Sequence, residues 1–530
     1  MQFSGRSIVG FQDGQESGDV FHAISPSTGE SLPGEFTSAG ARDVDRAAHL
    51  AAKAFETYSH VLPRTRGEFL RAIAARVESI AEPLIERAMR ETALPRARLQ
   101  GEAARTCNQL RLFAQVVEEG SWVGARIDRA DPARSPAPKP DIRSMLRPLG
   151  PVVVFGASNF PLAFSVAGGD TASALAAGNP VIVKAHPAHP GASMLVGEAI
   201  REAARECHLP EGVFSLLFDK GIEVGMALVN HPLVKAVGFT GSRAAGQALM
   251  RACASRPEPI PFFGEMSSTN PVFILAGALR ERAEQIATGL HGSFTLGAGQ
   301  FCTKPGIVLV PENPQTAAFV ARLVDLVQHS AAFTMLTPGI QRSYCSAVVE
   351  RKSVETLRLL AEAQPSADAS PLHTLAALFE TDAQSFLRNP SFADEVFGPA
   401  TLLVRYSTSE EMLEIARTLE GHLTATLHAT DEDLRGVADL SAILADKVGR
   451  LLLNGFPTGV EVCHAMVHGG PYPATSDGRS TSVGSQAIFR FARLVCYQGF
   501  PSDVLPDELK DANPRGIWRM VDGTFTRDAV

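Results

Sequence analysis

One cysteine of the chain lies in a loop that is rich in glycine. The segment TLGAGQFCTKPG, residues 295–306, surrounds Cys302 with Gly297, Gly299 and Gly306. Glycines allow tight backbone turns, in which a neighbouring amide can donate to a negatively charged oxygen near the sulfur. In such a loop we expect Cys302 to reach the thiolate form readily and to act as a nucleophile. A small buried thiol explains the same residues equally well.

A second candidate for chemistry is an isolated carboxylate. Glu265 lies in PFFGEMSSTNPVFIL and is the only charged residue between Glu258 and Arg280. The adjacent Phe262 and Phe263 are expected to disfavour its ionisation, which suits a general base that works near neutral pH. A carboxylate in a solvent-facing loop is the alternative interpretation.

A third candidate is the turn GFTGS, residues 238–242, between a β-branched run and a helical pattern. Ser242 is suited to cap a helix that begins at Arg243, and Gly241 lets backbone amides approach a ligand. The N-terminus of such a helix attracts phosphate groups. The GxGxxG fingerprint of many dinucleotide sites is absent, however, and an ordinary capped helix also explains the pentapeptide.

Three potential metal ligands lie close together in EVCHAMVHGG, namely Cys463, His464 and His468. Adjacent residues of an extended chain point to opposite faces, and no second ligand pair follows at zinc spacing. We therefore expect no metal site.

The elements around these candidates predict an α/β fold. Apolar residues recur at helical spacing between residues 63 and 117, where we expect two or three helices. The segments 150–184 and 234–254 each combine a β-branched run, a turn and a helical pattern, and a second such series begins near residue 266. Continuous apolar strands are typical of parallel sheets that are covered on both faces.

Composition excludes several classes of function. Hydrophobic residues make up 45% and charged residues 20% of the 530 residues, as in folded globular proteins. The net charge of -8 is spread along the chain, so we expect neither nucleic acid nor a membrane as partner. Seven cysteines without regular spacing and the lack of a recognisable secretory signal favour the cytoplasm.

Five segments in this order, FGASNFP, GFTGS, FFGEMSSTNP, GQFCTKPG and EVFGP, together resemble the aldehyde dehydrogenase superfamily. The likeness runs from about residue 20 to about residue 500 and is greatest to its bacterial 2-oxoglutarate semialdehyde dehydrogenases. It implies two Rossmann-like parallel-sheet domains and a small β oligomerisation segment. The expected division is a cofactor-binding domain from 1–137 and 151–265, a catalytic domain from 266–480, and an oligomerisation segment with a C-terminal tail from 138–150 and 481–530.

The resemblance also implies a reaction and its catalytic residues. Cys302 would attack the aldehyde carbon, while the Asn159 side chain and the Cys302 amide hold the oxyanion. Glu265 would activate the water that releases the acid from the thioester. The expected reaction is NAD(P)-dependent oxidation of 2-oxoglutarate semialdehyde to 2-oxoglutarate.

Cofactor contacts are implied for eight residues: Lys184, His186, Thr240, Gly241, Ser242, Met266, Glu395 and Phe397. One departure from the family concerns the adenosine ribose. Relatives that prefer NAD often carry a glutamate three residues after the lysine, where this chain has Pro187, and no acid occurs between Lys184 and Glu198. Without a carboxylate to repel the ribose 2'-phosphate, we expect NADP to be preferred, with NAD possible.

The substrate and the assembly are further expectations from the resemblance. The carboxylate of a 2-oxo acid semialdehyde would be held by arginine or hydroxyl donors, for which the candidates are Arg105, Arg479, Ser480 and Thr481. Solvated surface arginines are the alternative interpretation. The expected assembly is a homodimer or homotetramer.

Two other functions remain open at this point. A member of the same superfamily that uses NADP to oxidise fatty or other aldehydes would carry similar motifs. A cysteine hydrolase without nucleotide would pair Cys302 with a histidine such as His291 or His464.

Overall fold

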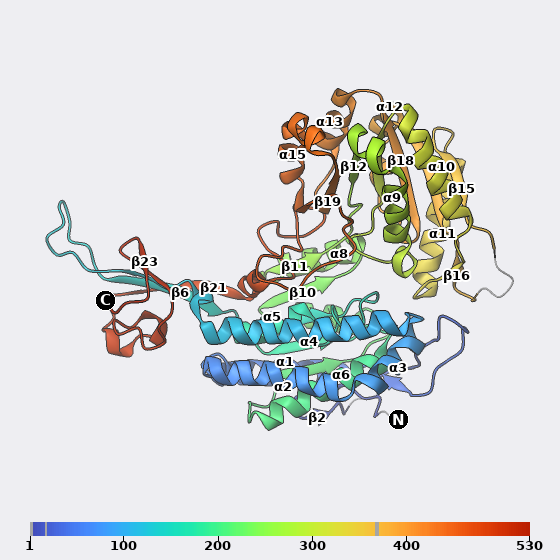
Figure 1. Cartoon of the computed structure of the whole chain (residues 1–530). Coiled ribbons are helices and arrows are strands. Elements are labelled where there is room, and N and C mark those ends of the chain that lie inside the picture. The colour runs from blue at the N-terminus through green and yellow to red at the C-terminus, as the bar shows by residue number, and fades with distance from the viewer. Residues whose placement is uncertain (1–3, 16–17, 366–369) are drawn as a thin grey trace.

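The computed structural model describes residues 4–15, 18–365 and 370–530. Two seven-stranded sheets, each covered by helices, form the body of the molecule, and a five-stranded sheet projects from it as an arm (Figure 1). Two short two-stranded sheets, β3–β4 and β14–β16, complete the strand pairings; their bounds are Val20–Phe21, Phe36–Thr37, Phe333–Thr334 and His373–Thr374.

The first large sheet has the strand order β11-β10-β7-β8-β9-β1-β2. Its five strands from β11 to β9 are parallel and almost entirely buried, as their apolar sequences predict. The bounds are Ile8–Val9 for β1, Gln12–Asp13 for β2, Val152–Phe155 for β7, Val181–Lys184 for β8, Phe214–Leu217 for β9, Ala236–Thr240 for β10 and Phe262–Glu265 for β11.

The strand order of this sheet reverses between β7 and β10. The chain first adds β8 and β9 on one side of β7 and then returns to place β10 and β11 on the other side. At such a switch point the loops that leave the two strands diverge and open a crevice at the carboxyl ends, where α/β proteins bind ligands. The loops in question carry FGASNFP and GFTGS. The connecting helices are α5 Gly169–Ala177, α6 Pro190–Glu206, α7 Glu223–Asn230 and α8 Arg243–Ala254.

Four helices lie in the chain between β2 and β7 of this sheet. The helical pattern of residues 63–117 forms three of them, as expected, because Pro63 begins α2 and Pro95 separates α3 from α4. Their apolar faces contribute to one core with β7, β8 and β9. The bounds are α1 Ala41–Tyr58, α2 Pro63–Ser79, α3 Ala81–Thr92 and α4 Arg96–Glu119.

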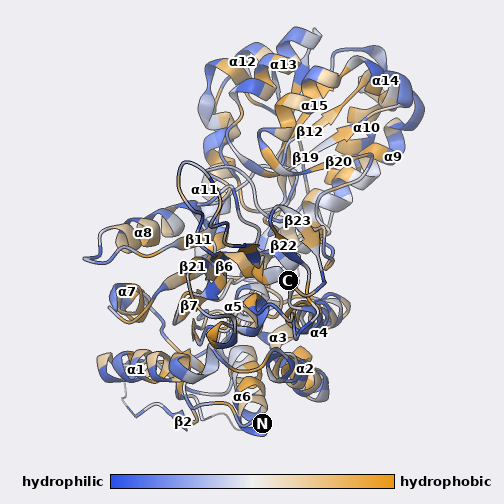
Figure 2. Ribbon diagram, turned by 90° about the vertical axis from the view of Figure 1, so that its left-hand side faces the viewer, coloured by the Kyte–Doolittle hydropathy of each residue, from blue (hydrophilic) through white to orange (hydrophobic). Residues whose placement is uncertain are grey.

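The second large sheet has the order β15-β17-β18-β13-β12-β19-β20, in which only β15 is antiparallel to its neighbour. In Figure 2 apolar residues gather on its central strands, whereas the outer helices α12, α13 and α14 are largely polar. The strands are β12 Val272–Ile274, β13 Ile307–Pro311, β15 Arg358–Glu362, β17 Ala377–Asp382, β18 Ala400–Tyr406, β19 His422–His428 and β20 Val448–Leu453. The helices are α9 Ala276–Thr295, α10 Pro314–Gln328, α11 Pro338–Ser353, α12 Ala383–Arg388, α13 Ser409–Thr418, α14 Asp431–Gly436 and α15 Ala438–Ala445.

The arm is a five-stranded sheet of order β21-β6-β5-β22-β23. Residues 126–128, expected in the cofactor-binding domain, form β5 and pair with β6 instead, because the proline-rich segment 131–141 is the exposed connection of a hairpin between them. In other respects the three sheets follow the expected division of the chain, which stays a prediction. The bounds are β5 Arg126–Asp128, β6 Ile142–Pro148, β21 Ala492–Gln498, β22 Arg519–Val521 and β23 Thr524–Thr526.

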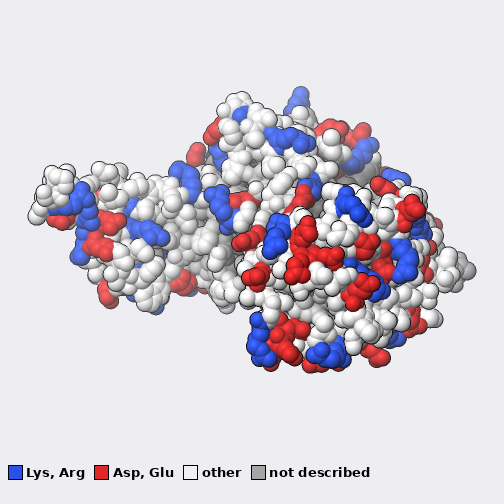
Figure 3. Space-filling model, turned by 90° about the horizontal axis from the view of Figure 1, so that it is seen from above, with Lys and Arg blue, Asp and Glu red and all other residues white. Residues whose placement is uncertain are grey.

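Two surface properties bear on possible partners. Lysine and arginine side chains are interspersed with aspartate and glutamate over the face drawn in Figure 3. Within the described ranges, the structure contains no helix with both the length and the apolar character that a bilayer crossing requires.

Candidate active site

The loop that carries Cys302 has an unusual backbone. After α9 ends at Thr295, Gly297, Ala298 and Gly299 all adopt left-handed conformations, with φ of 57°, 59° and 66°. A Cβ atom on Gly299 would lie 2.2 Å from the backbone of Gly398, so only glycine fits there. The loop is thereby held directly against the segment that precedes β18.

Asn270 fixes the position of Cys302 from the other side. Its buried side-chain amide donates to the Cys302 carbonyl at 2.8 Å and to the Lys304 carbonyl at 3.0 Å. The amide oxygen accepts from the hydroxyls of Ser268 and Thr424. Because every polar atom of this amide has a partner, Asn270 anchors the cysteine loop to the start of β12.

Asn159 brings the first sheet to the same loop. It lies in the segment after β7, and its side-chain amide donates to the carbonyl of Gln300 at 3.0 Å. The loop at the switch point of the first sheet is therefore joined to the chain two residues before Cys302. This is the neighbourhood that the resemblance implies for Asn159.

Glu265 is the last residue of β11, at the carboxyl edge of the first sheet, and its side chain is only 3% exposed. Its Oε1 lies 3.0 Å from Nε2 of His468, and its Oε2 accepts from the Ser482 hydroxyl at 2.9 Å. The Cys302 sulfur lies 3.4 Å from the same Nε2 atom. The structure therefore brings Cys302 and Glu265 together, with His468 between them.

The sequence did not predict His468 at this site. Its backbone amide donates to the Thr481 hydroxyl at 2.8 Å, and its carbonyl accepts from the Ser482 amide at 2.8 Å. The sequence feature that could have indicated the position of His468 is the pair of glycines directly after it. A Cβ on Gly469 or Gly470 would lie within 2.5 Å of a neighbouring carbonyl oxygen. This segment therefore passes very close to other parts of the backbone.

The histidines expected for a cysteine hydrolase lie elsewhere. His291 Nε2 contacts the Ser330 hydroxyl at 2.7 Å, and His464 is exposed. The expectation that either would pair with Cys302 is wrong, because α9 directs His291 toward α10 and the loop at 464 stays at the surface. Cys463 and His464 are likewise absent from the group that His468 forms with Cys302 and Glu265 within the described ranges.

The ionisation of Glu265 differs from the expectation. Burial raises the pKa of this carboxyl, as the neighbouring phenylalanines suggested. The charge and hydrogen bond of His468 and the hydrogen bonds of Cys302 and Ser482 outweigh burial, so the net pKa lies below the ordinary value. Glu265 is therefore a carboxylate near neutral pH.

The ionisation of Cys302 is also opposite to the expectation. Burial, followed by the charge and the hydrogen bond of Glu265, raises the pKa of the thiol well above its ordinary value, and Arg105 opposes this only in part. The resting sulfur is therefore a thiol. It needs a proton acceptor as it attacks, and Glu265 and His468 are both within reach.

The predicted contacts at the GFTGS turn have the expected local form. Ser242 precedes α8 and its hydroxyl accepts from the Ala245 amide at 3.3 Å, while Thr240 ends β10. A Cβ on Gly246 would lie 2.7 Å from the sulfur of Met266, so the first turn of α8 packs closely on the segment after β11. Together with Gly241, these residues present a capped helix N-terminus at the switch point of the sheet.

Lys184 and His186 lie at the carboxyl end of β8. The Lys184 ammonium donates to the carbonyls of Asp219 and Gly221 at 3.3 and 3.4 Å. The His186 ring stacks on His189 with centroids 5.6 Å apart, and its Nδ1 accepts from the Ala188 amide. Burial lowers the pKa of His186 well below its ordinary value, and the charges of His189 and Lys184 act in the same direction.

Glu395 and the half-buried Phe397 come from the segment before β18. Burial raises the pKa of Glu395 to about 7, against the opposing charge of Lys304 and hydrogen bonds from Ser267 and Ser268. Burial likewise lowers the pKa of Lys304 to about 7. Lys304, two residues after Cys302, was not predicted as a site residue, and its charge opposes the rise in the pKa of the half-buried Glu395.

Arg105 projects from α4 toward the cysteine. Its Nε donates to the Val460 carbonyl at 3.3 Å, and its guanidinium lies over the Phe164 ring at 5.0 Å. Its buried Nη2 has no hydrogen-bond partner in the described part of the chain. Burial lowers the pKa of Arg105, and the negative charges of Glu102, Cys302 and Glu265 oppose this effect.

Two arginines that the sequence did not single out are also coupled to Cys302. A thiolate at Cys302 would oppose the burial that lowers the pKa of Arg98 and of Arg450. The Arg98 guanidinium contacts the rings of Phe160 and Phe301, and Arg450 donates to the carbonyls of Pro457 and Gly459. The sulfur is therefore coupled electrostatically to positive charge on Arg98, Arg105 and Arg450 and to the carboxylates of Glu265 and Glu395.

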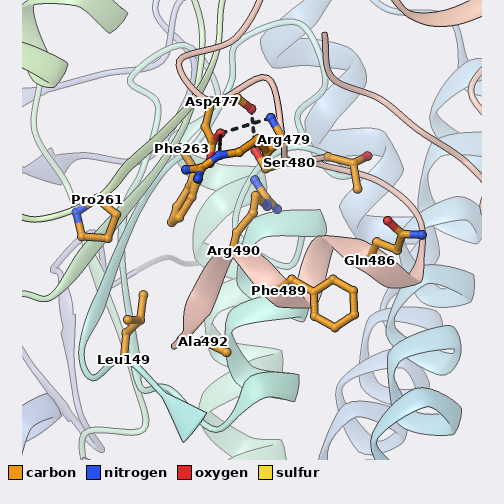
Figure 4. A pocket seen from close by; sticks show the side chains of 11 residues that line it. Leu149, Pro261, Phe263, Asp477, Arg479, Ser480, Gln486, Phe489, Arg490 and Ala492 are labelled. Carbon is orange, nitrogen blue, oxygen red and sulfur yellow. Dashed lines mark hydrogen bonds and ion pairs between the residues drawn. The ribbon is translucent and has the colours of Figure 1, made fainter. Parts of the chain in front are cut away.

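The other three predicted substrate contacts lie in a separate pocket of about 360 Å³ at the base of the arm (Figure 4). Arg479 and Ser480 line it together with Phe489 and Arg490, whereas Cys302 and Glu265 do not. Arg479 is 91% exposed and paired with Asp477 at 3.0 Å. Thr481, which also lines the pocket, reaches the site only through its hydrogen bond with the His468 amide.

Removal of the Glu265 charge is expected to make Cys302 more reactive toward alkylation. In Glu265→Gln the thiol loses the anion that raises its pKa and the carboxylate that holds its proton, so more thiolate exists at neutral pH. A pKa lower by one gives about tenfold more thiolate where the thiol predominates. The check is the rate of iodoacetamide labelling of the Cys302 peptide between pH 6 and 10.

In both proteins labelling should rise with pH, with the profile of Glu265→Gln displaced to lower pH. Glu461→Gln, which neutralises an exposed carboxylate seven residues before His468, is the matched control and should keep the wild-type profile. Coincident profiles for Glu265→Gln and the wild type would contradict the assigned charge effect.

Comparison with known proteins places this geometry in a family. Residues 11–471 match the aldehyde dehydrogenase family. The chain is 50% identical over 527 residues to "Alpha-ketoglutaric semialdehyde dehydrogenase 2" of Azospirillum brasilense, covering 99% of both chains. It is 45% identical over 496 residues to "Alpha-ketoglutaric semialdehyde dehydrogenase" of Acinetobacter baylyi, covering 93% of both chains.

The fold is shared with solved structures of lower sequence similarity. Betaine aldehyde dehydrogenase of Staphylococcus aureus, solved in complex with NAD+, superposes with a TM-score of 0.81 at 21% identity, covering 94% of this chain and 96% of the other. The extent of the family match and the identity to full-length relatives agree with the arrangement of Cys302, Glu265 and Asn159 across two α/β units. The chain belongs to the aldehyde dehydrogenase family.

Proposed function

We propose that this chain oxidises 2-oxoglutarate semialdehyde to 2-oxoglutarate with a nicotinamide dinucleotide, NADP in preference to NAD. The observation that carries the proposal is one buried site that holds the Cys302 thiol, the Glu265 carboxylate and an arginine with an unpaired guanidinium nitrogen. Two relatives of 45% and 50% identity bear the name of this activity.

The first step is attack of the Cys302 sulfur on the aldehyde carbon. The S–H bond breaks as the C–S bond forms, and the proton passes to His468 or Glu265, whose acceptor atoms are the nearest to the sulfur. The oxygen that becomes negative is held by the Asn159 side chain, which must exchange its Gln300 partner, and by the Cys302 amide. The product is a thiohemiacetal on Cys302.

The residues at the switch point fit a dinucleotide. The N-terminus of α8, capped by Ser242, presents the positive end of the helix dipole where a pyrophosphate can lie. Substitution of Gly241 would bring a Cβ within 2.6 Å of the Phe239 ring, so this turn is shaped for close approach of the backbone. Glu395 and Phe397 are suited to orient the ribose and the ring. The nicotinamide, when bound, supplies the acceptor for the hydride of the thiohemiacetal.

The second step is hydrolysis of the thioester that remains on Cys302. Glu265 is charged near neutral pH and lies within 4.8 Å of the sulfur, so it is placed to take a proton from a water beside the thioester carbon. As Glu265 takes that proton, the water oxygen bonds to the thioester carbon. The C–S bond then breaks, which releases the acid and leaves a thiolate that regains a proton. Glu265 is thus placed to accept a proton at two stages, during the attack by Cys302 and during the release of the acid.

Substrate choice follows from the arginines around the sulfur. A carboxylate on the aldehyde would find the unpaired Nη2 of Arg105, with Arg98 and Arg450 adding positive charge nearby. Burial of such a guanidinium is favourable only when an anion arrives to pair with it. A fatty aldehyde would leave it unpaired, which supports the acidic semialdehyde.

The cysteine hydrolase alternative finds less support in the geometry. In a hydrolase relay, the histidine uses one nitrogen toward the nucleophile and the other toward the residue that orients it. In this site Cys302 and Glu265 both face Nε2 of His468, and Nδ1 is buried with no partner in the described chain.

The substrate assignment is tested with a panel of aldehydes. We expect NADP reduction with 2-oxoglutarate semialdehyde to have the largest kcat/KM, above succinic semialdehyde and hexanal, and to vanish in Cys302→Ala. In Arg105→Met the KM for 2-oxoglutarate semialdehyde should rise roughly 10- to 100-fold, because a charged hydrogen bond is lost. The value for hexanal should change less than twofold.

Arg479→Met, which removes an arginine of the separate pocket, is the matched control and should leave both KM values near those of the wild type. Preference for hexanal in the wild type would replace the proposed substrate. Ester cleavage without any nucleotide-dependent aldehyde oxidation would favour the hydrolase.

The preference for NADP rests on Lys184, His186 and Pro187 at the end of β8. Lys184 is a cation beside the expected adenosine ribose, and Pro187 occupies the position at which a glutamate would repel a 2'-phosphate. We expect kcat/KM for NADP to exceed that for NAD. Pro187→Glu should lower the NADP value about tenfold, a cost of about 1.4 kcal/mol, and should not lower the NAD value.

Steady-state kinetics with both nucleotides measure these values, and Pro187→Gln serves as the neutral control. A wild-type kcat/KM for NAD well above that for NADP would refute the preference while leaving the reaction itself intact.

We further propose that the chain assembles as a homodimer or homotetramer through two open sheet edges. β20 ends the second large sheet and β21 ends the arm sheet, and Leu453 and Leu494 on these strands are 51% and 67% exposed. Edge strands with apolar side chains favour pairing with another chain. Addition of β21 to β20 of another subunit covers both edges.

Leu494→Arg is expected to shift the sedimentation coefficient toward that of the monomer, because a charge on the paired edge must be buried. Leu359→Arg on β15, the opposite edge of the second sheet, is the control and should keep the assembly. An unchanged sedimentation coefficient for Leu494→Arg would argue against this edge.

A further inference from the structure

Three groups of different chemistry converge within the buried site. The Cys302 sulfur, one oxygen of Glu265 and Nε2 of His468 all lie within 4.8 Å of one another. The N···O distance is 3.0 Å and the S···N distance is 3.4 Å. We propose that these three side chains bind a thiophilic divalent cation such as Zn²⁺, and that the cation reversibly blocks the nucleophile.

The ligand set and its spacing suit zinc. Zinc takes cysteine sulfur at about 2.3 Å and histidine nitrogen or carboxylate oxygen at about 2.0 to 2.2 Å in tetrahedral geometry. Ligand atoms around such a centre lie about 3.3 to 3.6 Å apart. The observed separations are close to these values, so small outward rotations of the side chains would admit the ion. Water would occupy the fourth position, as at zinc sites with three protein ligands.

The three ligand atoms face a common point and do not form a chain that runs from one residue to the next. Cys302 and Glu265 approach the same nitrogen of His468, so the lone pairs of all three ligands face one volume. When the thiol is deprotonated, the Cys302 thiolate and the Glu265 carboxylate lie close together in a buried site. A divalent cation removes the repulsion between these charges, whereas a monovalent proton removes only part of it.

Binding has a defined proton balance. The S–H bond of Cys302 breaks, a Zn–S bond forms, and the proton leaves to solvent. His468 must carry its single proton on Nδ1 so that the Nε2 lone pair is free. No oxidation occurs, and removal of the metal restores the thiol.

The residues around the three ligands predict that the metal ion binds reversibly and is not bound permanently. Tight zinc sites usually provide a hydrogen-bond acceptor for the second nitrogen of a ligand histidine. His468 Nδ1 is buried and has no such partner within the described residues. The bound state therefore carries an unpaired donor, which weakens affinity. The proposal departs from the expectation from the sequence that the chain has no metal site.

Another cluster within the described ranges can compete for metal. Asp45, His49 and His231 bring one ligand atom each within the same 4.8 Å limit. That cluster lacks sulfur, and Asp45 and His49 are exposed. A probe that reports sulfur coordination separates the two locations.

The test is a titration of the enzyme with Co²⁺, without aldehyde or nucleotide, that follows the thiolate-to-cobalt charge-transfer absorption. The wild type should give a saturable band that Zn²⁺ abolishes by displacement. Cys302→Ser should lose the band, and His468→Gln should weaken binding at least about tenfold. Cys463→Ser and His49→Gln are matched controls, one at a nearby cysteine and one in the surface cluster, and both should keep the wild-type affinity.

A second measurement uses Zn²⁺ itself. Zn²⁺ should slow iodoacetamide labelling of Cys302 in the wild type, a chelator should restore the rate, and His468→Gln should lose most of the protection. Circular dichroism of each variant establishes that it is folded.

The proposal is overturned if the wild type gives no cobalt–thiolate band, if His468→Gln binds Co²⁺ as tightly as the wild type, or if Cys463→Ser abolishes the band. None of these readouts involves aldehyde oxidation. A failure here therefore leaves the proposed function untouched, and a failure of the proposed function leaves the metal site testable.

Discussion

The contact between Glu265 and His468 joins two parts of the chain that are 203 residues apart, and the chemistry of the site depends on it. Burial alone would protonate Glu265, whereas the histidine keeps it charged. The resulting carboxylate in turn keeps Cys302 protonated at rest. This buried pair thus influences the pKa of Glu265 and, together with burial, that of Cys302. Each pKa shifts in the direction opposite to the one that its sequence context suggests.

The two large sheets are arranged so that this pair can form. The first sheet presents the carboxyl ends of its strands, where Asn159 and Glu265 lie, and the second presents the segments that precede β12, β13 and β18. Asn270 and the close contact of Gly299 with Gly398 hold those segments together around the loop that carries Cys302. Such contacts limit how far the sulfur can move, which favours precise placement relative to an aldehyde carbon.

Much of this arrangement was accessible from the sequence. The α/β class, the helices of residues 63–117 and the Ser242 cap follow from local periodicity and turn chemistry, and the family motifs correctly pointed to Cys302, Glu265 and Asn159 as neighbours. His468 and Arg450 were missed because their roles depend on long-range packing, for which a single sequence contains no periodic signal. The prediction that ionisation of Glu265 is disfavoured was wrong for the same reason. Arg479 was misplaced because Asp477, two residues earlier, pairs with it at the surface.

A protonated resting cysteine has a consequence for the whole enzyme. Thiolates are the forms that oxidise and that react with adventitious electrophiles, so a high thiol pKa protects Cys302 while the site is empty. The same proton must leave during attack, and its acceptors are the groups that raised the pKa. Positive charge from Arg105 opposes Glu265, and an arriving substrate carboxylate would neutralise part of that positive charge. Binding of an acidic aldehyde would therefore raise the pKa of the thiol further, so that proton transfer to His468 or Glu265 has to accompany the attack, which couples substrate recognition to proton transfer at the nucleophile.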